Sequence, residues 1–319
     1  MKKATRNKVL RAAAAAVLCL AALAALGCQR EEATAIKVGA LKGPTGMGLA
    51  YMMQQNGGED GGIELYDAPD AVTGKFISGE LDIAAVPINL AATLYNRLEG
   101  DVRMLAVNTL GVLYILENGD TIGSLAGLSG KTVYATGQGS TPEYVLKGLL
   151  EQAGIADVTV EFVGEHAALA AMMASGEAEI AMLPEPNVSA VLLKNPNVRV
   201  ALDLNQQWKQ HMGNDLVQGC YIARASFAEA HPAAIEQFLK DCAASVERVN
   251  SDEGAAALIA EQGILPSEAV AAKAIPSCNI VCLTGDEMYQ AASGMLQTLY
   301  DANPQSIGGA LPGGDLYGN

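Results

Sequence analysis

Two short loops carry residue types that suit the binding of a small polar molecule. The first is Lys42-Gly43-Pro44-Thr45-Gly46, which Met47 follows, and the second is Gly137-Gln138-Gly139-Ser140-Thr141-Pro142. Glycine lets a backbone approach a ligand closely, and Thr or Ser adds a hydroxyl group that can also cap a helix. Each loop comes before a helical pattern, whose first N–H groups have no partner within the helix. The loops therefore predict two clamps on a ligand, although ordinary strand-to-helix turns use the same residue types.

The spacing of the two loops is repeated elsewhere in the chain. Thr45 and Thr141 are 96 positions apart, and the segment 78–84 (SGELDIA) is echoed 97 positions later by 175–181 (SGEAEIA). Val86-Pro87 follows the first of these segments closely, and Leu183-Pro184 follows the second. Offsets that agree within one residue indicate an internal repeat. We therefore expect two units of similar plan, each with one loop that faces the other unit.

Short apolar runs of the β type alternate with helical stretches, which predicts an α/β protein with mostly parallel sheets. In such sheets ligands bind beyond the carboxyl ends of the strands, where both loops would lie. A tail rich in Gly and Pro after Ile307 is expected to pack loosely. The expected strands are 36–41, 63–66, 83–86, 103–108, 114–117, 132–135, 158–162, 180–183 and 220–223, and the expected helices are 47–55, 71–78, 142–153, 166–175, 231–250, 253–262, 266–273 and 286–300.

The first residues have the pattern of an export signal. Five basic residues and no acidic one precede an apolar run, 12–26, that is short for a membrane span, and Gly27-Cys28 follows. This pattern predicts a signal peptide over 1–27 and a lipid on Cys28, with a linker over 28–34. Ala25 stands where lipoprotein signals usually have Leu. A plain signal peptide or a membrane anchor is the alternative.

Charge and cysteine content limit the function further. Residues 1–27 hold five of the 20 Lys and Arg and none of the 35 Asp and Glu, so their removal leaves 15 basic and 35 acidic residues, a net charge of −20. Nucleic acid is an improbable partner for so acidic a surface. No later apolar run is long enough to cross a bilayer. The spacing Cys278-x3-Cys282 is a weak zinc pattern, and free thiols or one disulfide among Cys220, Cys242, Cys278 and Cys282 remain open.

The segments 40–47, 83–95, 137–144, 182–186 and 303–309 carry a family resemblance. The chain resembles the substrate-binding lipoproteins of bacterial ABC importers, in the branch that handles nitrate, sulfonates, taurine and the pyrimidine precursor of thiamine. The resemblance runs from about residue 36 onward. It implies a type II periplasmic-binding-protein fold, with two lobes joined by a two-strand hinge. Lobe 1 would comprise 35–121 and 224–319, and lobe 2 would comprise 122–223.

The family also implies a mechanism. A ligand bridges the lobes and shifts the hinge equilibrium towards the closed form, which docks on a membrane permease. The protein would be a monomer on the outer side of the membrane, without cofactor, metal or catalytic activity. We expect Pro87 and Asn89 to end a strand and cap the next helix, and Glu185 to be held stiffly between two prolines. The expected ligand residues are Gly43, Pro44, Thr45, Gly46, Met47, Pro87, Asn89, Asn108, Thr109, Tyr114, Gln138, Ser140, Thr141 and Glu185.

These residues limit the chemical class of the ligand only loosely. Free N–H groups suit anions or carbonyl groups, yet the loops hold a single cation, Lys42, and Glu185 favours an N–H donor. A small neutral or amino-bearing heterocycle such as a thiamine-type pyrimidine is therefore preferred over a sulfonate or another oxyanion. Enzymes on the same fold, such as a pyrimidine-precursor synthase or a chorismate-dehydratase-like enzyme, work inside cells, so the export signal disfavours them. A sensory ectodomain would need a downstream membrane helix, which the sequence lacks, unless a partner supplies one.

Overall fold

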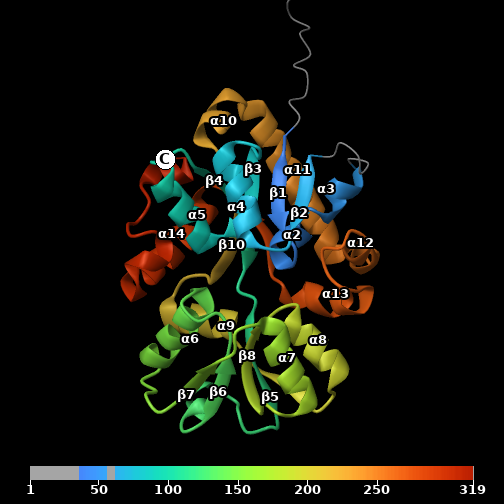
Figure 1. Cartoon of the computed structure of the whole chain (residues 1–319), viewed down its shortest axis with the longest axis vertical. Helices are drawn as coiled ribbons and strands as arrows, with labels where there is room; N and C mark the ends of the chain where they lie inside the picture. Colours follow the sequence, from blue (N-terminus) through green and yellow to red (C-terminus); the bar gives the residue numbers. More distant parts are fainter. Residues whose placement is uncertain (1–35, 56–61, 319) are drawn as a thin grey trace, which may run out of the picture. The chain divides into compact units, whose positions relative to one another are not determined.

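The computed structural model describes residues 36–55 and 62–318. The predicted signal peptide, Cys28 and the linker lie outside these residues. The described chain forms two β-sheets flanked by helices (Figure 1). The six-stranded sheet has the order β11-β4-β10-β3-β1-β2, and the five-stranded sheet has the order β7-β6-β8-β5-β9. We call the six-stranded sheet with its helices lobe 1 and the five-stranded sheet with its helices lobe 2.

The strands of lobe 1 are β1 (Val38–Leu41), β2 (Ile63–Tyr66), β3 (Ile83–Pro87), β4 (Arg103–Leu110), β10 (Val217–Ala223) and β11 (Ile280–Leu283). The strands of lobe 2 are β5 (Leu113–Asn118), β6 (Thr132–Ala135), β7 (Thr159–Phe162), β8 (Ile180–Pro184) and β9 (Val198–Asp203). The helices of lobe 1 are α2 (Pro44–Met47), α3 (Ala50–Gln55), α4 (Pro69–Ser78), α5 (Ile88–Arg97), α10 (Ala225–Ala230), α11 (Pro232–Ser251), α12 (Ala255–Glu261), α13 (Glu268–Ala274) and α14 (Gly285–Ala302). Those of lobe 2 are α6 (Thr141–Gln152), α7 (His166–Ser175), α8 (Asn187–Lys194) and α9 (Leu204–Met212), and the short 3₁₀ turns are η1 (Leu125–Leu128), η2 (Ile275–Ser277), η3 (Pro304–Ile307) and η4 (Gly314–Tyr317).

The strand orders confirm the internal repeat. The order β2-β1-β3-β10-β4 in lobe 1 corresponds strand for strand to β7-β6-β8-β5-β9 in lobe 2. In each of these orders the fourth strand, β10 or β5, is antiparallel to both neighbours and is the first strand after the chain arrives from the other lobe. Both sheets are therefore mixed. Four strands of each run in one direction, and the crossing strands account for most of the antiparallel pairing.

The chain changes lobes at positions that differ from the predicted boundaries. It crosses from β4 to β5 at Gly111-Val112 and returns between β9 and β10. The boundaries after residues 121 and 223 had placed β5 in lobe 1 and β10 in lobe 2, the reverse of their sheet membership. A two-residue connection between strands looks like a hairpin in the sequence, but β5 pairs with β8 and β9 instead of β4.

The repeated Ser-Gly-Glu segments end helices in the same way in both lobes. Gly79 and Gly176 have φ angles of 78° and 82°, in the left-handed region that favours glycine. The next residue in each case, Glu80 or Glu177, donates its backbone N–H to a carbonyl five positions earlier, at 2.9 Å. These are the hydrogen bonds of a Schellman motif. The local sequence therefore stops each helix and directs the chain into β3 or β8.

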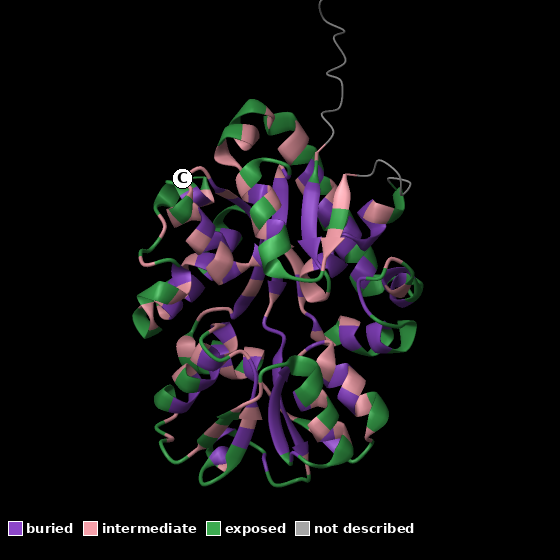
Figure 2. Cartoon of the chain, viewed as in Figure 1, coloured by how far each residue is buried: buried purple, intermediate pink, exposed green. Residues whose placement is uncertain are grey.

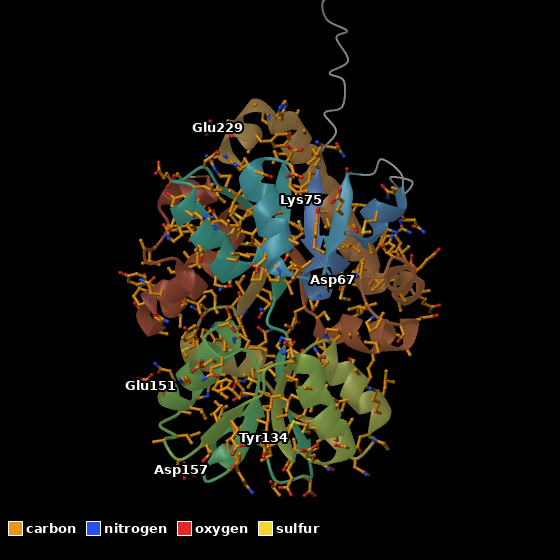
Figure 3. All side chains as sticks on the ribbon, in the orientation of Figure 1. Asp67, Lys75, Tyr134, Glu151, Asp157 and Glu229 are labelled. Carbon is orange, nitrogen blue, oxygen red and sulfur yellow. The ribbon has the colours of Figure 1, made fainter. Side chains whose placement is uncertain are left out.

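The hydrophobic core continues from one lobe into the other. One cluster contains Val86 of β3, Met182 of β8 and Met295 of α14, together with the fully buried Trp208 of α9. The indole N–H of Trp208 donates to Oδ1 of Asn214 at 2.8 Å, so its polar atom has a partner. Figure 2 shows buried residues gathered along the strands. Figure 3 labels the exposed carboxylates Glu151, Asp157 and Glu229, part of the acidic surface.

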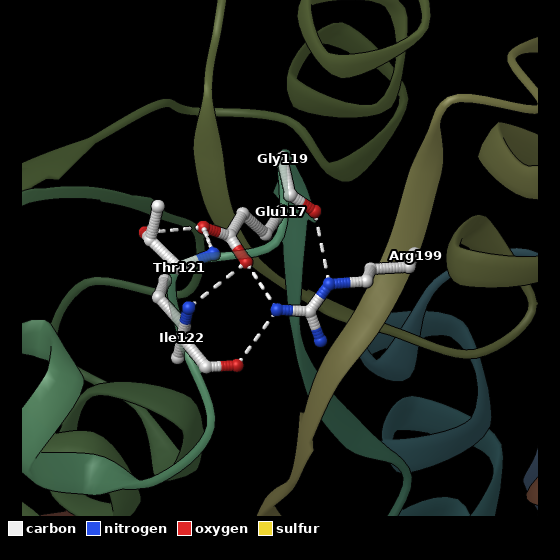
Figure 4. Close-up of polar contacts among 5 residues, drawn as sticks. All are labelled: Glu117, Gly119, Thr121, Ile122 and Arg199. Carbon is white, nitrogen blue, oxygen red and sulfur yellow. Dashed lines mark hydrogen bonds and ion pairs between the residues drawn. The ribbon is translucent and has the colours of Figure 1, made fainter.

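An ion pair anchors β5 to β9 at the end of β5 that follows Glu117 (Figure 4). Glu117 is buried and accepts hydrogen bonds from the backbone N–H groups of Thr121 and Ile122 and from Nη2 of Arg199. Arg199 also donates to the carbonyl groups of Gly119 and Ile122, at 2.9 and 2.7 Å. Burial raises the pKa of Glu117, but these hydrogen bonds and the guanidinium outweigh it and leave the pKa below its ordinary value. The pair thus fixes the turn that leaves the crossing strand.

Several elements differ from the sequence-based expectation. The helix expected over 47–55 begins at Pro44 and is divided into α2 and α3, and the expected elements omitted α8, β9, α9, α10 and β11. The tail after Ile307 is not loosely packed. Ile307 and Leu316 are fully buried, and the hydroxyl of Tyr95 donates to Asp315 at 2.6 Å. Contacts with distant segments, which a local pattern does not contain, hold the tail in place.

Candidate functional site

The first predicted clamp follows β1 and begins the short helix α2. Gly43 has the N-cap position with a φ angle of 91°, which favours glycine, and Pro44 has the first helical position, where a missing N–H costs little. Thr45 is half-buried and Gly46 is buried. Met47 is fully buried in a core cluster with helices α3, α11, α12 and α13. Met47 therefore stabilises lobe 1 by packing. The polar groups of the loop are Thr45, the backbone and Lys42, which pairs with Asp67 at 2.8 Å.

Thr45 lies beside a buried pair of polar residues on β4. Asn108 donates from Nδ2 to the carbonyl of Thr45 at 3.4 Å, and Thr109 donates its hydroxyl to Oδ1 of Asn108 at 3.0 Å. Gly219 on β10 faces Asn108 and the clamp residue Thr45. A Cβ atom at position 219 would lie 2.7 Å from Oδ1 of Asn108 and 3.5 Å from Oγ1 of Thr45. Gly219 thus makes room for this group and was missed, because a strand glycine signals a close approach without naming its partner.

Pro87 and Asn89 lie where β3 ends and α5 begins. Pro87 has the N-cap position, and no side chain caps the helix there. The expectation that Asn89 caps α5 is wrong, because Nδ2 of Asn89 instead donates to the carbonyl of Ser306 at 3.4 Å. That contact ties the start of α5 to η3. It involves a residue 217 positions away, so the local sequence could not indicate it.

The second clamp lies between β6 and α6 and is built on two glycines with positive φ. Gly137 and Gly139 have φ angles of 78° and 75°. Ser140 has the N-cap position of α6, but its hydroxyl donates to the carbonyl of Gly137 at 2.7 Å and caps no helical N–H group. Thr141 is buried at the first helical position, and Gln138 is exposed. The loop therefore presents Gln138 and backbone groups, while Ser140 stabilises the turn.

Glu143 in the first turn of α6 holds the same loop from the helix side. Its Oε2 accepts a hydrogen bond from the backbone N–H of Gly139 at 2.6 Å, and Lys147 pairs with its other oxygen. These two contacts keep the pKa of Glu143 below its ordinary value. The carboxylate is thus occupied within the loop, which agrees with a structural role for a first-turn glutamate.

Tyr114 lies on β5, two residues beyond the crossing at Val112. It is 5% exposed, and its hydroxyl donates to the carbonyl of Ser277 in η2 of lobe 1 at 2.7 Å. Burial is the main cause that raises the pKa of Tyr114 above its ordinary value. Tyr114 was expected among the ligand residues. The structure places it at the lobe interface with its hydroxyl already engaged, so only its ring remains for contact with a ligand.

Glu185 follows β8 and precedes α8. It is 3% exposed, and its carboxylate accepts hydrogen bonds from the backbone N–H and the hydroxyl of Ser189, at 3.1 and 3.0 Å. Burial raises the pKa of Glu185 to about 7, although the two bonds from Ser189 and the charge of Lys273 act in the opposite direction. Strongly perturbed carboxylates at strand ends are frequent in functional sites. Among the predicted site residues, Glu185 is the carboxylate whose pKa the fold raises into the physiological range.

Thr136 and His166 form a further polar pair that the sequence analysis did not place in the site. Thr136 follows β6 and is 1% exposed, and His166 begins α7 after β7. Oγ1 of Thr136 lies 2.6 Å from Nδ1 of His166. Burial lowers the pKa of His166 and thus favours the neutral ring. The pair lies at the same strand-end edge of the sheet as the second clamp, which the separate positions in the sequence could not show.

A cavity of about 320 Å³ lies elsewhere in lobe 1, beside β11. None of the fourteen expected ligand residues lines it. Its two polar side chains, Asn250 and Asn279, already donate to the carbonyl groups of Ile280 and Gly111. Because its polar side chains are satisfied, we place the candidate site at the strand ends instead. The cavity is lined by Leu110, Asn250, Ile275, Pro276, Asn279, Ile280 and Val281.

The described residues offer no preformed metal site, since no three His, Cys, Asp or Glu side chains in 36–55 and 62–318 are grouped as a metal ion requires. Cys220, Cys242, Cys278 and Cys282 are free thiols, and the first three are buried. None of the helices in the described part of the chain has the length and apolar character of a membrane span.

Residues 100–253, just under half of the chain, match the protein-family model described as NMT1/THI5 like. Comparison with curated protein sequences finds no match. Solved structures are similar over most of the chain. A crystal structure of an ABC transporter from Parabacteroides distasonis has a TM-score of 0.77 and 24% sequence identity, and the similarity covers 90% of this chain and 99% of that one.

Two binding proteins with known ligands have the same fold. The periplasmic aliphatic sulphonate binding protein SsuA of Escherichia coli has a TM-score of 0.67 and 21% identity, covering 87% of this chain and 92% of that one. The periplasmic nitrate-binding protein NrtA of Synechocystis PCC 6803 has a TM-score of 0.59 and 15% identity, covering 89% and 83%. The family match and these folds confirm the resemblance to the substrate-binding proteins of ABC importers and the two-lobed type II fold.

Proposed function

We propose that this protein is the solute-binding component of an ABC importer and captures a small polar molecule between its lobes. The observation that carries the proposal is the repeated strand order, which gives each lobe one glycine-rich loop at the same strand-end edge. In open α/β sheets this edge is where ligands bind. We infer that two such edges, joined by two crossing connections, face each other and close on a ligand between them. The proteins of the same fold named above support a binding role instead of a catalytic one.

The ligand that best fits the site carries an N–H donor. Within residues 36–55 and 62–318, the buried carboxylate of Glu185 accepts hydrogen bonds from Ser189 alone, and a carboxylate prefers to accept hydrogen bonds from N–H groups. Asn108 and Gln138 can both donate and accept. A small neutral or amino-bearing polar heterocycle, such as a thiamine-type pyrimidine, satisfies this combination. Tyr114, with its ring beside the crossing, can pack against such a ring.

The arginines of the described residues support this choice. Arg103, Arg199, Arg224 and Arg248 pair with Glu229, Glu117, Asp101 and Asp252, respectively. Arg97 lies in the last turn of α5, at the opposite end of that helix from Pro87. Oxyanion sites often use Arg because its planar fork matches anionic oxygens. In the part of the chain that the structure describes, the five arginines are therefore placed away from the two clamps.

A sulfonate or another oxyanion is the second candidate. It is favoured by the start of α6, where backbone N–H groups follow the second clamp, and by the ligands named for SsuA and NrtA. Charge distinguishes the two candidates. An oxyanion would be repelled by the charged form of Glu185, whereas an amino-bearing heterocycle would be attracted to it.

Titration calorimetry with pyrimidines and sulfonates tests the proposal. We expect an amino-pyrimidine to bind, and the Glu185→Gln variant to bind it at least tenfold more weakly, in line with the loss of a charge-assisted hydrogen bond. The exposed Glu177→Gln variant of the same lobe is the control and should bind as the wild type does. Tight binding of a sulfonate without any pyrimidine heat would replace the first candidate by the second. Binding of neither class would contradict the proposed ligands.

The location completes the proposal. We infer an extracytoplasmic monomer that is released from its signal peptide at residue 27, held to the membrane by a lipid on Cys28, and delivers its ligand to a permease. The basic start and the apolar run before Cys28 support the export signal. The periplasmic location named for SsuA and NrtA agrees with it.

A further inference from the structure

Two hydrogen bonds connect lobe 2 directly to lobe 1. The hydroxyl of Tyr114 on β5 donates to the carbonyl of Ser277 in η2, at 2.7 Å. Nδ2 of Asn303, which follows α14, donates to the hydroxyl of Tyr144 in α6, at 2.9 Å. Helices of the two lobes also lie side by side, α13 with α8 and α14 with α6 (Figure 1). Each of the two hydrogen bonds joins residues more than 150 positions apart.

The two bonds lie on opposite faces of the sheet of lobe 2. Tyr114 belongs to a cluster with Leu169 of α7 and Val188 of α8. The helix that carries Tyr144 packs through Val145 and Leu149 into the other cluster, which also contains α9. Contacts on both faces resist a rotation of lobe 2 in either direction, whereas a contact on one face would act only as a pivot.

The bond of Asn303 also reaches the second clamp. Its Oδ1 accepts the backbone N–H of Gln305 at 3.1 Å and so caps η3. The hydroxyl of Tyr144, which accepts from Asn303, lies 3.4 Å from the carbonyl of Gly139 in the clamp loop. In the sequence, the segment 303–309 is part of the family resemblance but has no predicted role. The structure gives it one, because it connects the end of α14 to the loop that faces the ligand.

We propose that these two hydrogen bonds form a latch that holds the lobes together before a ligand binds. The proposal rests on the proposed function, since a latch matters only in a protein that opens and closes. A ligand that binds the closed form gains affinity when that form is already populated, because less of its binding free energy is needed to close the lobes. The two hydrogen bonds would therefore raise affinity through the closed form, separately from any packing of the Tyr114 ring against the ligand.

The expected effect of each bond is modest and measurable. A typical hydrogen bond contributes enough to change an equilibrium about fivefold. Loss of both bonds should raise the ratio of open to closed protein roughly 25-fold. The affinity for a ligand that needs the closed form should fall by at most the same factor.

Small-angle X-ray scattering of the ligand-free protein tests the latch without knowledge of the ligand. The variants are Tyr114→Phe, Tyr144→Phe and the double variant, each of which removes a hydroxyl and keeps the ring. The control is Tyr95→Phe, because the Tyr95 hydroxyl bonds to Asp315 within lobe 1. A compact chain of this size has a radius of gyration of about 19 Å. We expect a larger radius for the double variant than for the wild type or the control.

A second variant separates the latch from local damage. Asn303→Ser keeps a residue that can cap η3 but is too short to reach Tyr144. If the two residues act through one bond, the pair Asn303→Ser and Tyr144→Phe should open the lobes no more than either change alone. An unchanged scattering curve for the double tyrosine variant overturns the latch, whatever the ligand data show. If no tested ligand binds but the double tyrosine variant still has the larger radius of gyration, the proposed ligands are contradicted and the latch stands.

Discussion

Glu185 places a carboxylate in a buried position that disfavours its charge, which a purely structural residue would not need. A carboxylate that is 3% exposed loses the solvation of its charged form, and the hydroxyl and N–H of Ser189 restore only part of it. A glutamine of similar size could accept one of these bonds without any charge. Local conflicts of this kind are expected at functional sites, where stability is lost in exchange for binding. The residue therefore gives a prediction of its own.

The stability of the protein should fall between pH 4.5 and 7 because of Glu185. Its pKa is about 7 in the folded protein and near 4.5 when exposed. In this range the folded protein holds more protons than the unfolded chain, so a rising pH favours unfolding. Glu185→Gln should remove this loss and be more stable than the wild type at pH 8, by about 3 kcal/mol, with no difference near pH 4.5. Denaturant unfolding at both pH values measures this, and an equal difference at each pH would contradict it.

Strand β10 shows how an element sets the geometry of a site that lies mainly on its neighbours. It is antiparallel to both β3 and β4, and its register shifts around Gly219. At that position the absent side chain leaves space for Asn108 and Thr45. The crossing strand therefore brings the polar residues of β4 and the first clamp together, and it does so with a glycine at the point of closest approach.

A side chain at position 219 should therefore disturb ligand binding more than folding. Gly219→Ala would place a methyl group 2.7 Å from Oδ1 of Asn108, so Asn108 and Thr45 must move apart. We expect an affinity loss of tenfold or more and a stability loss of about 1–3 kcal/mol. Gly74→Ala is the control, because a Cβ atom there meets nothing within 4 Å in α4. Calorimetry and thermal unfolding compare the two, and equal affinities would remove Gly219 from the site.

At the scale of the whole molecule, two copies of one plan share a core and exchange one strand each. Val86 of lobe 1 and Met182 of lobe 2 lie in the same hydrophobic cluster. Strand β5 follows the crossing from lobe 1 and joins the sheet of lobe 2, and β10 follows the return crossing and joins the sheet of lobe 1. A continuous core on one side restricts relative motion of the lobes to small rotations about the two crossings. The proposed latch acts on the same motion, and the proposed lipid anchor keeps the molecule beside its permease.

The anchor can be tested on the whole molecule in cells. A Cys28→Ser variant should lose the thiol that takes the lipid and appear in the soluble envelope fraction, whereas the wild type should stay with the membrane. Cys19→Ser is the matched control, since that cysteine lies within the predicted signal peptide. Fractionation and immunoblotting measure the distribution. Membrane retention of the Cys28→Ser variant would contradict the lipid and favour an uncleaved apolar anchor.

Local chemistry was enough to predict the repeat, the two glycine-rich loops and the two-lobed α/β fold. The glycines at 79 and 176 stop helices through their own backbone angles, so their signal is present in a few residues. The tertiary structure decided what depends on distant partners. The hydroxyl of Tyr114 turns to Ser277, 163 positions away, and β5 joins the sheet that the hairpin-like connection at Gly111 did not suggest. Pairing and burial are long-range interactions, and only the folded chain brings those groups together.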